Sequence, residues 1–498
     1  MTMNKNTDST RVPASAPAGG EPANYIDDFR RAGHETVDWI AAYLSSLGER
    51  PVLAVTKPGE LFDALPASAP QQGESFDAIL ADFDKLIMPA VTQWNHPRFF
   101  AYFACTGTTP AVLGEMLAAA LNTNGLHWKT SPAVAELEQK TLDWLRQWLG
   151  LGGDASTDSA SATAGGGSPN PWFGIIYDTA STSSMHAIVC AREMVAPEAR
   201  FHGSKGDLVL YTSDQAHSSI EKGAIAVGIG QKNVRKVPSD KEFRMKADAL
   251  AAMVAEDKAA GKRPFCVVAT VGTTSTTSID PVPQIVEIAE KYGMWVHVDA
   301  AYAGAVAVLP EHRHILAGAA RAHSLVFNAH KWLLTPIDLS AFYTRRPDIL
   351  RQAFSLTPEY LKTQDDPRAH NLMDYGVPLG HRFRALKLWF VLRYFGRDRI
   401  EAMLRQHIAW AQQLALLVDA DPRFERVAPV PFSVVCFRYR GSDEQNKLIM
   451  EKVNASGRVF IAGTVLNGQQ VIRLAIGNLH TKWQDVAEAW ELVKKAAE

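Results

Sequence analysis

Between residues 172 and 347, short apolar segments rich in β-branched and aromatic residues alternate with helical patterns, and this alternation constrains the fold more than any other feature. The segments are apolar throughout rather than at every second position. Such strands are buried on both faces, which is typical of a parallel sheet covered by helices. The sequence therefore predicts an α/β domain with a mostly parallel sheet. The five segments are residues 173–177, 208–211, 266–269, 295–298 and 324–327.

A lysine, Lys331, follows the last of these segments within the motif Asn-Ala-His-Lys-Trp at residues 328–332. Ligands of open parallel sheets bind at the carboxyl ends of the strands. A lysine amine removed from water can bond covalently to a carbonyl group, including that of pyridoxal phosphate. Since most lysines after a strand are simply solvated, this motif alone is suggestive rather than decisive.

A second motif lies upstream, where Asp299 ends the segment 295–298 and small residues follow it. Enzymes that use pyridoxal phosphate place a carboxylate against the pyridine nitrogen, and a small residue beside it lets the ring lie flat. Asp299 and Ala301 supply both, and two strand ends can bring Lys331 to the same place. An isolated aspartate here could equally cap a helix or a turn. Together the two motifs predict a pyridoxal phosphate site.

The motifs His-Val-Asp-Ala-Ala-Tyr-Ala-Gly at 297–304 and Asn-Ala-His-Lys-Trp at 328–332 resemble those of the group II pyridoxal-phosphate-dependent decarboxylases of the aromatic-L-amino-acid type. With gaps, the resemblance extends from about residue 25 to near the C-terminus. It implies the fold-type I architecture, with an N-terminal helical segment and a small α+β C-terminal domain. It also implies a homodimer with a shared active site.

The resemblance assigns cofactor contacts around these motifs. Free N–H groups at a helix start suit a phosphate dianion, although a hydroxyl-rich helix start needs no ligand at all. A histidine that matches the one stacked on the cofactor ring, and a threonine close to cofactor and substrate, complete the set. With Asp299, Ala301 and Lys331, the implied contacts are Ala180, Ser181, Asn328 and His330 for the phosphate, His217 for the ring, and Thr273.

The resemblance also implies a substrate pocket, whereas the aromatic cluster near residue 100 would by itself indicate core packing. Gly380 matches a position where histidine-specific relatives carry serine, which favours an aromatic side chain. Tyr360 matches the residue implicated in protonating the α-carbon, and it acts with Lys331, His217 and Asp299 as a catalytic residue. Departures from the animal enzymes, including Cys105 and Leu126, leave tyrosine, DOPA, phenylalanine and tryptophan open as substrates. The implied substrate contacts are Trp94, Tyr102, Phe103, Leu126 and Gly380.

Composition excludes several other classes of protein. The net charge is −2, so nothing favours nucleic acid or an anionic membrane surface as a partner. No apolar run is long enough to cross a bilayer. The four cysteines are widely spaced and lack metal-ligand pairing, which predicts no metal site and a reducing, cytoplasmic compartment.

Patterning divides the chain into segments. The low-complexity insertion cannot form a core, and the long polar connection before the final domain is typical of a lid. The predicted parts are a disordered N-terminus (1–24), an N-terminal helical dimerisation segment (25–108), a large cofactor-binding domain (109–382) with a flexible insertion (152–171) and a mobile catalytic lid (352–380), and a small C-terminal domain (383–498).

The sequence thus predicts an enzyme that decarboxylates aromatic L-amino acids to amines with pyridoxal 5'-phosphate. One alternative is an aromatic aldehyde synthase, which uses oxygen to take the same reaction on to an aldehyde. Relatives of that kind often replace the residue that matches His217 or Tyr360, and both are retained here. Another alternative is a catalytically dead relative that acts as a binding protein, which the intact Asp299 and Lys331 disfavour. The sequence does not rank the aromatic substrates.

Overall fold

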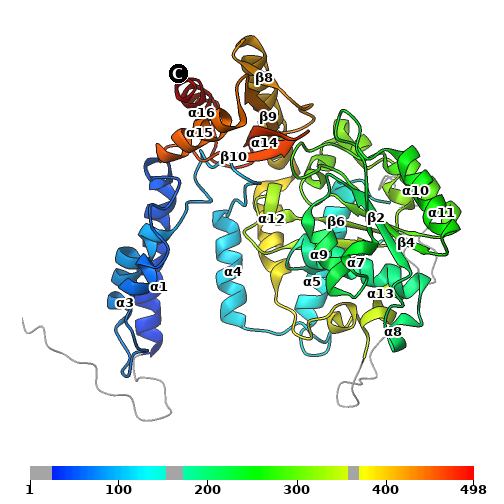
Figure 1. Ribbon diagram of the computed structural model, residues 1–498. Coiled ribbons are helices and arrows are strands. Elements are labelled where there is room, and N and C mark those ends of the chain that lie inside the picture. The colour runs from blue at the N-terminus through cyan, green and yellow to red at the C-terminus, as the bar shows by residue number, and fades with distance from the viewer. Residues whose placement is uncertain (1–24, 153–171, 357–368) are drawn as a thin grey trace, which may run out of the picture. The chain divides into compact units, whose positions relative to one another are not determined.

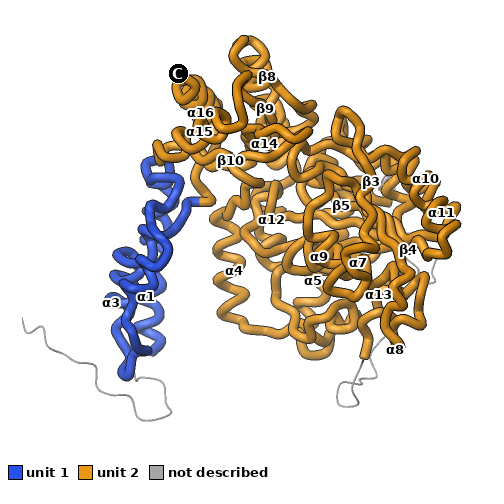
Figure 2. Tube along the Cα trace, in the orientation of Figure 1, with its two compact units in different colours: residues 1–93 blue, residues 94–498 orange. Residues whose placement is uncertain are grey.

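The structure, a computed structural model, describes residues 25–152, 172–356 and 369–498. It divides into two compact units, residues 1–93 and 94–498 (Figure 2). Three predicted features lie wholly or almost wholly outside the described residues: the N-terminus 1–24, the insertion 152–171 and Tyr360.

The first unit is helical, with α1 (Tyr25–Ser46), α2 (Glu60–Ala64) and α3 (Phe76–Asp82). The indole of Trp39 stacks on Tyr43 with ring centroids 5.3 Å apart and meets the edge of Phe83 at 5.1 Å. These contacts hold α1 against the helical turn after α3. Within α1 only Ala32 is fully buried, and the apolar side chains of Tyr25, Ile26, Phe29 and Val37 are exposed. Helices α1 and α3 lie within the predicted N-terminal helical segment.

The second unit contains a seven-stranded sheet of order β1-β7-β6-β5-β4-β2-β3. Strands β6, β5, β4, β2 and β3 are parallel to their neighbours in turn, whereas β7 is antiparallel to both β6 and β1. The predicted mostly parallel sheet is therefore confirmed. The strands are β1 (Phe173–Tyr177), β2 (Leu208–Ser213), β3 (Val234–Val237), β4 (Arg263–Thr270), β5 (Trp295–Asp299), β6 (Ser324–Phe327) and β7 (Ser340–Thr344).

Helices cover this sheet, and every residue of β2, β5, β6 and β7 is buried (Figure 1). Edge strand β1 is closed by two side chains of α5: the Gln139 amide donates to the Gly174 carbonyl at 2.9 Å, and the Glu138 carboxylate accepts from the backbone N–H of Ile176 at 2.8 Å. These contacts satisfy backbone groups that an edge strand would leave unpaired. The helices are α4 (Thr109–Leu121), α5 (Pro132–Trp148), α7 (Ala180–Val195), α8 (Ala199–His202), α9 (Ser218–Ala226), α10 (Ala247–Ala259), α11 (Val282–Tyr292), α12 (Ala329–Trp332) and α13 (Pro347–Phe354).

The C-terminal part of the same unit holds a four-stranded antiparallel sheet of order β10-β11-β9-β8. Its hairpin turns at Asn467 and Gly468, both at positive φ, as the Asn-Gly pair predicts. Helix α14 (Arg384–Ala420) is interrupted at Gly396, where φ is 64°, a conformation that glycine adopts readily. The other elements are β8 (Phe424–Arg426), β9 (Val434–Tyr439), α15 (Asp443–Ala455), β10 (Ala462–Leu466), β11 (Gln469–Ala475) and α16 (Trp483–Ala496).

One predicted boundary differs from the structure. Residues 94–108 belong with the second unit rather than with the N-terminal helices, because Phe100 donates its N–H to the Phe460 carbonyl at 2.8 Å and accepts from the Ala475 N–H at 2.9 Å. Of the predicted lid, 352–380, the structure describes residues 352–356 and 369–380, and residues 372–375 form a short buried helical turn. In the part of the chain that the structure describes, no helix has the length and hydropathy needed to cross a membrane.

Candidate active site

A cavity of about 200 Å³ lies at the carboxyl ends of β4, β5 and β6. The register aligns Thr270 with Asp299, and Asp299 with Val326, so these strands end side by side. The Asn328 N–H donates to the Ala301 carbonyl at 3.1 Å, which ties the loop after β6 to the loop after β5. Parallel register thereby brings together residues distant in the sequence. The cavity is lined by Phe103, Thr179, Ala180, Ser181, His217, Ser219, Thr270, Gly272, Thr274, Asp299, Ala301, Tyr302, Asn328, His330 and Lys331.

Lys331 and Asp299 are the charged pair of this cavity. Burial lowers the pKa of the Lys331 amine, which favours its neutral, nucleophilic form. The Asp299 carboxylate and the Cys105 thiol oppose that shift, and the Arg473 guanidinium adds to it. One carboxylate oxygen of Asp299 accepts from the Ala301 N–H at 3.1 Å, which fixes the buried acid at the end of β5.

The start of helix α7 forms another wall. Its N-cap residue, Thr179, makes no side-chain capping hydrogen bond, so N–H groups of the first turn stay available to an anion. Nearby, the buried Oδ1 of Asn328 has no hydrogen-bond partner among the described residues. Burial lowers the pKa of His330 to about 4, so this imidazole is neutral near pH 7. Its Nδ1 accepts from the Leu339 N–H at 3.0 Å, which leaves the proton on Nε2.

The structure gathers most of the predicted cofactor residues, with one exception. Thr273 does not line the cavity, although its neighbours Gly272 and Thr274 do. Its hydroxyl accepts from the Ser278 N–H at 3.0 Å and lies 3.0 Å from the Thr276 hydroxyl, so it is used inside its own loop. The predicted residues that do line the cavity are Phe103, Ala180, Ser181, His217, Asp299, Ala301, Asn328, His330 and Lys331.

The other predicted substrate residues do not line this cavity within one chain. Trp94 and Tyr102 stack with centroids 5.8 Å apart, and both stay substantially exposed, at 42% and 55%. Leu126 is partly buried and does not line the cavity. Gly380 lines a separate cavity of about 260 Å³, together with Thr182 of α7. The first turns of α7 therefore border both cavities.

Sequence reasoning did not identify Arg473 as a site residue. This buried arginine of β11 lies 4.5 Å from the Phe103 ring centroid. Its guanidinium donates to the carbonyls of Tyr102 and Ser275, while Nη2 has no hydrogen-bond partner among the described residues. The sequence did contain a signal for Arg473, because it is a charged residue inside the apolar run 471–474. Such a charge is costly to bury, which is typical of a functional residue.

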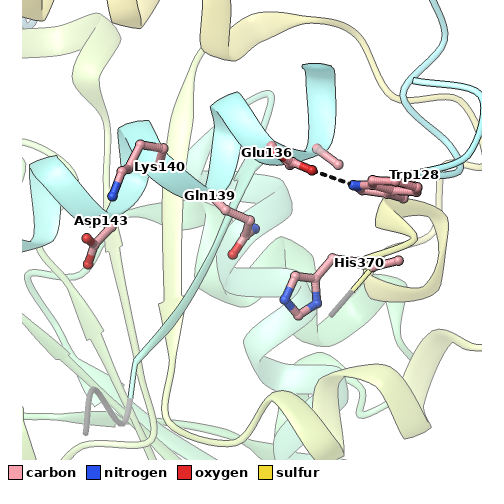
Figure 3. A pocket seen from close by; sticks show the side chains of 8 residues that line it. Trp128, Glu136, Gln139, Lys140, Asp143 and His370 are labelled. Carbon is pink, nitrogen blue, oxygen red and sulfur yellow. Dashed lines mark hydrogen bonds between the residues drawn. The ribbon is translucent and has the colours of Figure 1, made fainter. Parts of the chain in front are cut away.

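A more voluminous cavity, about 710 Å³, lies elsewhere (Figure 3). The Trp128 indole donates to the Glu136 carboxylate at 2.9 Å there, and His370 lies across from the α5 side chains. Glu136 and Lys140 are exposed along one face of α5, and no strand end contributes to the lining. Cavity volume therefore does not identify the candidate site. The predicted site residues gather instead in the smaller cavity, where strand ends converge.

The chain is similar to known proteins along most of its length. The pyridoxal-dependent decarboxylase conserved domain matches residues 58–440. Tryptophan decarboxylase 2 of Oryza sativa subsp. japonica is 40% identical over 483 residues, 95% of this chain and 95% of the relative. Aromatic-L-amino-acid decarboxylase of Mus musculus is 40% identical over 479 residues, 94% of this chain and 97% of the relative.

Solved structures give the same result. The TDC of Oryza sativa with PLP and tryptamine superposes with a TM-score of 0.89 at 35% identity, covering 96% of this chain and 99% of the other. The 4-hydroxyphenylacetaldehyde synthase of Rhodiola rosea superposes with a TM-score of 0.86 at 31% identity, covering 95% and 98%. The predicted fold class is thereby confirmed.

Proposed function

Because this chain belongs to the pyridoxal-dependent decarboxylases, with pyridoxal 5'-phosphate as its cofactor, we propose that it decarboxylates aromatic L-amino acids to amines and CO₂. It is a pyridoxal-phosphate-dependent carboxy-lyase, and the proposal concerns its substrate and the residues that act on it.

The residues around the 200 Å³ cavity fit this cofactor. An uncapped helix start and the neutral Nε2–H of His330 offer donors for a phosphate. A lysine of lowered pKa offers a nucleophilic amine for an aldehyde, and a buried carboxylate suits a protonated pyridine nitrogen. We therefore assign Lys331 as the residue that holds the cofactor and Asp299 as the partner of its ring nitrogen.

When bound, the cofactor accepts the electrons left on the α-carbon as the carboxylate departs as CO₂. Asp299 keeps a proton on the ring nitrogen, because an anion there favours the positively charged form. His217, in the cavity lining, would orient the substrate. Lys331 would hold the cofactor aldehyde through its amine, and once the substrate amine has replaced it, that amine would be available beside the α-carbon. Positioning of the reacting groups is the protein's main contribution.

Phe103 carries the argument for an aromatic substrate. Its ring lies 5.3 Å from the Lys331 amine and stacks on Tyr302 at 3.7 Å, so an aromatic wall stands next to the covalent centre. Aromatic rings prefer such stacked or edge-on contacts. Apart from the two histidines, the charged residues of the described lining are Asp299 and Lys331, so the lining itself offers no further cation for an acidic substrate side chain; Arg473, 4.5 Å from the Phe103 ring, does not line the cavity.

A homodimer with a shared active site completes the proposal. Helix α4 exposes one continuous apolar stripe of Leu113, Leu117 and Leu121, each at least 49% exposed, together with Met116. Exposed leucines at this spacing favour burial against another helix. Leu126 lies in the loop that follows α4. If a partner subunit packs on this stripe, Leu126 would therefore lie near the cavity of the partner subunit. We propose that Leu126 and Gly380 adjust substrate choice across that interface.

The test is product analysis over a substrate panel. Purified enzyme with pyridoxal phosphate is given tyrosine, DOPA, phenylalanine, tryptophan, histidine and glutamate, and CO₂ and amine are measured. We expect aromatic substrates to exceed histidine and glutamate by at least roughly two orders of magnitude in kcat/KM. A preference for glutamate or histidine would overturn the proposal. Release of no CO₂ from any of them, despite bound cofactor, would favour a binding protein.

A second candidate, aldehyde formation, is favoured by the likeness to 4-hydroxyphenylacetaldehyde synthase. Tyr360 distinguishes the two, and we propose that it protonates the α-carbon to give the amine. Amine and CO₂ in equal amounts without hydrogen peroxide support decarboxylation alone. In Tyr360→Phe, slower protonation gives oxygen time to react, so the aldehyde and peroxide share rises. An unchanged ratio and rate would assign the proton to another group.

We also place the enzyme in the cytoplasm. All four cysteines are free, which is typical of a reducing compartment. Fractionation of cells that express the protein checks this placement, and recovery in an oxidising compartment would contradict it.

A further inference from the structure

Two histidines line the cavity, and each has its Nδ1 on a backbone N–H. His330 Nδ1 accepts from Leu339 at 3.0 Å, and His217 Nδ1 accepts from Ser219 at 3.1 Å. His217 is the N-cap residue of α9, so the helix start itself supplies that donor. One feature separates them: the hydroxyl of Ser219 lies 2.8 Å from the Nδ1 of His217, whereas the Nδ1 of His330 has only the backbone N–H.

A backbone N–H can donate but never accept, so the nitrogen that faces it must carry a lone pair. Neutral His217 therefore holds its proton on Nε2. No described residue hydrogen-bonds to that nitrogen, and the exposed side chain keeps it open to a ligand. A hydroxyl, in contrast, can either donate or accept. The Ser219 hydroxyl donates to the neutral ring and turns to accept from Nδ1–H when the ring is protonated.

We infer that Ser219 is a positioning residue: its N–H and hydroxyl hold His217 with an Nε2–H donor facing the cavity, where it binds the substrate carboxylate. This inference deepens the proposed function and rests on it. The tautomer of His217 is itself independent of substrate. Ser219 is 5% exposed and lines the cavity beside His217, so its side chain is held in place by the surrounding protein.

The charges that face His217 explain why the hydroxyl matters. Burial and the Lys331 amine lower the pKa of His217, and Lys222 on its own helix adds a smaller effect. Asp299 on β5 opposes them. The imidazolium form therefore has few groups that favour it, and the Ser219 hydroxyl is the one that contacts Nδ1 directly.

The test uses the holoenzyme and its cofactor-free form, labelled with ¹⁵N-histidine, in wild type, Ser219→Ala and Ser219→Thr. Ser218→Ala is the matched control, because Ser218 is the adjacent exposed serine and no hydrogen bond joins it to His217. His217→Gln identifies the resonances. NMR then gives the protonation of each ring nitrogen and the pKa of His217, and steady-state kinetics give kcat and KM separately.

We expect unprotonated Nδ1 and protonated Nε2 in neutral wild-type His217. Ser219→Ala should lower the pKa of His217 further and raise KM for the amino acid about two- to tenfold, the range for one lost hydrogen bond. Cofactor affinity should be unchanged. Ser219→Thr and Ser218→Ala should behave like wild type. A protonated Nδ1 in the neutral ring, or an unchanged pKa in Ser219→Ala, would overturn the inference whatever substrate the enzyme takes. Failure of the substrate panel with the expected tautomer would overturn only the proposed function.

Discussion

The two halves of the proposed active site are built differently. The cofactor half lies at the ends of three adjacent parallel strands, where register aligns Thr270 with Asp299 and Asp299 with Val326. The substrate half is spread over loops: Trp94 and Tyr102 are exposed, and Gly380 borders another cavity. Among the described residues, Phe103 joins the two halves, since it lines the cavity and directly follows Tyr102 of the aromatic segment.

This difference has a physical reason. Covalent and electrostatic chemistry needs groups fixed to a fraction of an ångström, and buried parallel strands provide that rigidity. Substrate selection needs surfaces that can vary, and loops supply them. We therefore propose that residues of one chain hold the cofactor, whereas substrate selection also uses residues that do not line the cavity. Substitutions in the two halves should therefore differ in the size of their effect on activity.

Lys331→Ala attacks the centre of the cofactor half. We expect kcat to fall by at least roughly three orders of magnitude, because both the covalent link and the amine beside the α-carbon are lost. Borohydride reduction and peptide mapping of the wild type should place the pyridoxyl label on Lys331. Lys222→Ala, an exposed lysine of α9, is the matched control and should stay near wild-type activity. A label on another lysine would contradict the assignment.

Asp299→Asn removes the charge but keeps the shape. A neutral amide holds the ring proton poorly, so activity should fall roughly two or more orders of magnitude. Circular dichroism and thermal unfolding should show the fold retained, since the Oδ1 that accepts from the Ala301 N–H is kept. Near-normal turnover would refute the proposed pairing.

The pH dependence of cofactor attachment reports the field around Lys331. The neutral amine reacts, so the attachment rate of the cofactor-free enzyme should rise with pH, with a midpoint below the ordinary lysine value of 10.5. Asp299 favours the protonated amine, so Asp299→Asn should move that midpoint lower still. Stopped-flow absorbance across pH measures it. A midpoint at or above 10.5 would mean that the amine is well solvated.

Leu117→Glu attacks the substrate half indirectly, by placing a charge on the apolar stripe of α4. We expect dissociation of the dimer and about a tenfold or greater loss of activity at low protein concentration. Leu448→Glu on α15 is the matched control, because both leucines are 49% exposed. Sedimentation velocity with parallel assays measures the effect. A wild-type dimer in Leu117→Glu would move the interface elsewhere.

Gly380→Ser should produce the smallest effect. An added Cβ would meet Asn124 at 3.7 Å, an ordinary contact, so the fold should tolerate it. We expect the ratio of tyrosine to histidine turnover to fall about two- to tenfold, while cofactor affinity stays unchanged. Gly73→Ser, at an open position, is the control. An unchanged ratio would remove Gly380 from the substrate half.

From the sequence alone, strands β1, β2, β4, β5 and β6 and the two cofactor motifs could be predicted, because buried parallel strands leave continuous apolar segments; β3 and β7 were not predicted. Local residue types also account for the turn at Asn467 and Gly468 and for the break of α14 at Gly396, where φ is positive. These features depend on neighbours along the chain.

Only the tertiary structure decided which side chains face the cavity. It turned Thr273 into its own loop, and it brought Arg473 of β11 against Phe103, 370 residues earlier in the chain. It also placed the Ser219 hydroxyl and N–H on the Nδ1 of His217. Such contacts depend on long-range packing and on the rotation of single bonds, and neither leaves a periodic trace in the sequence.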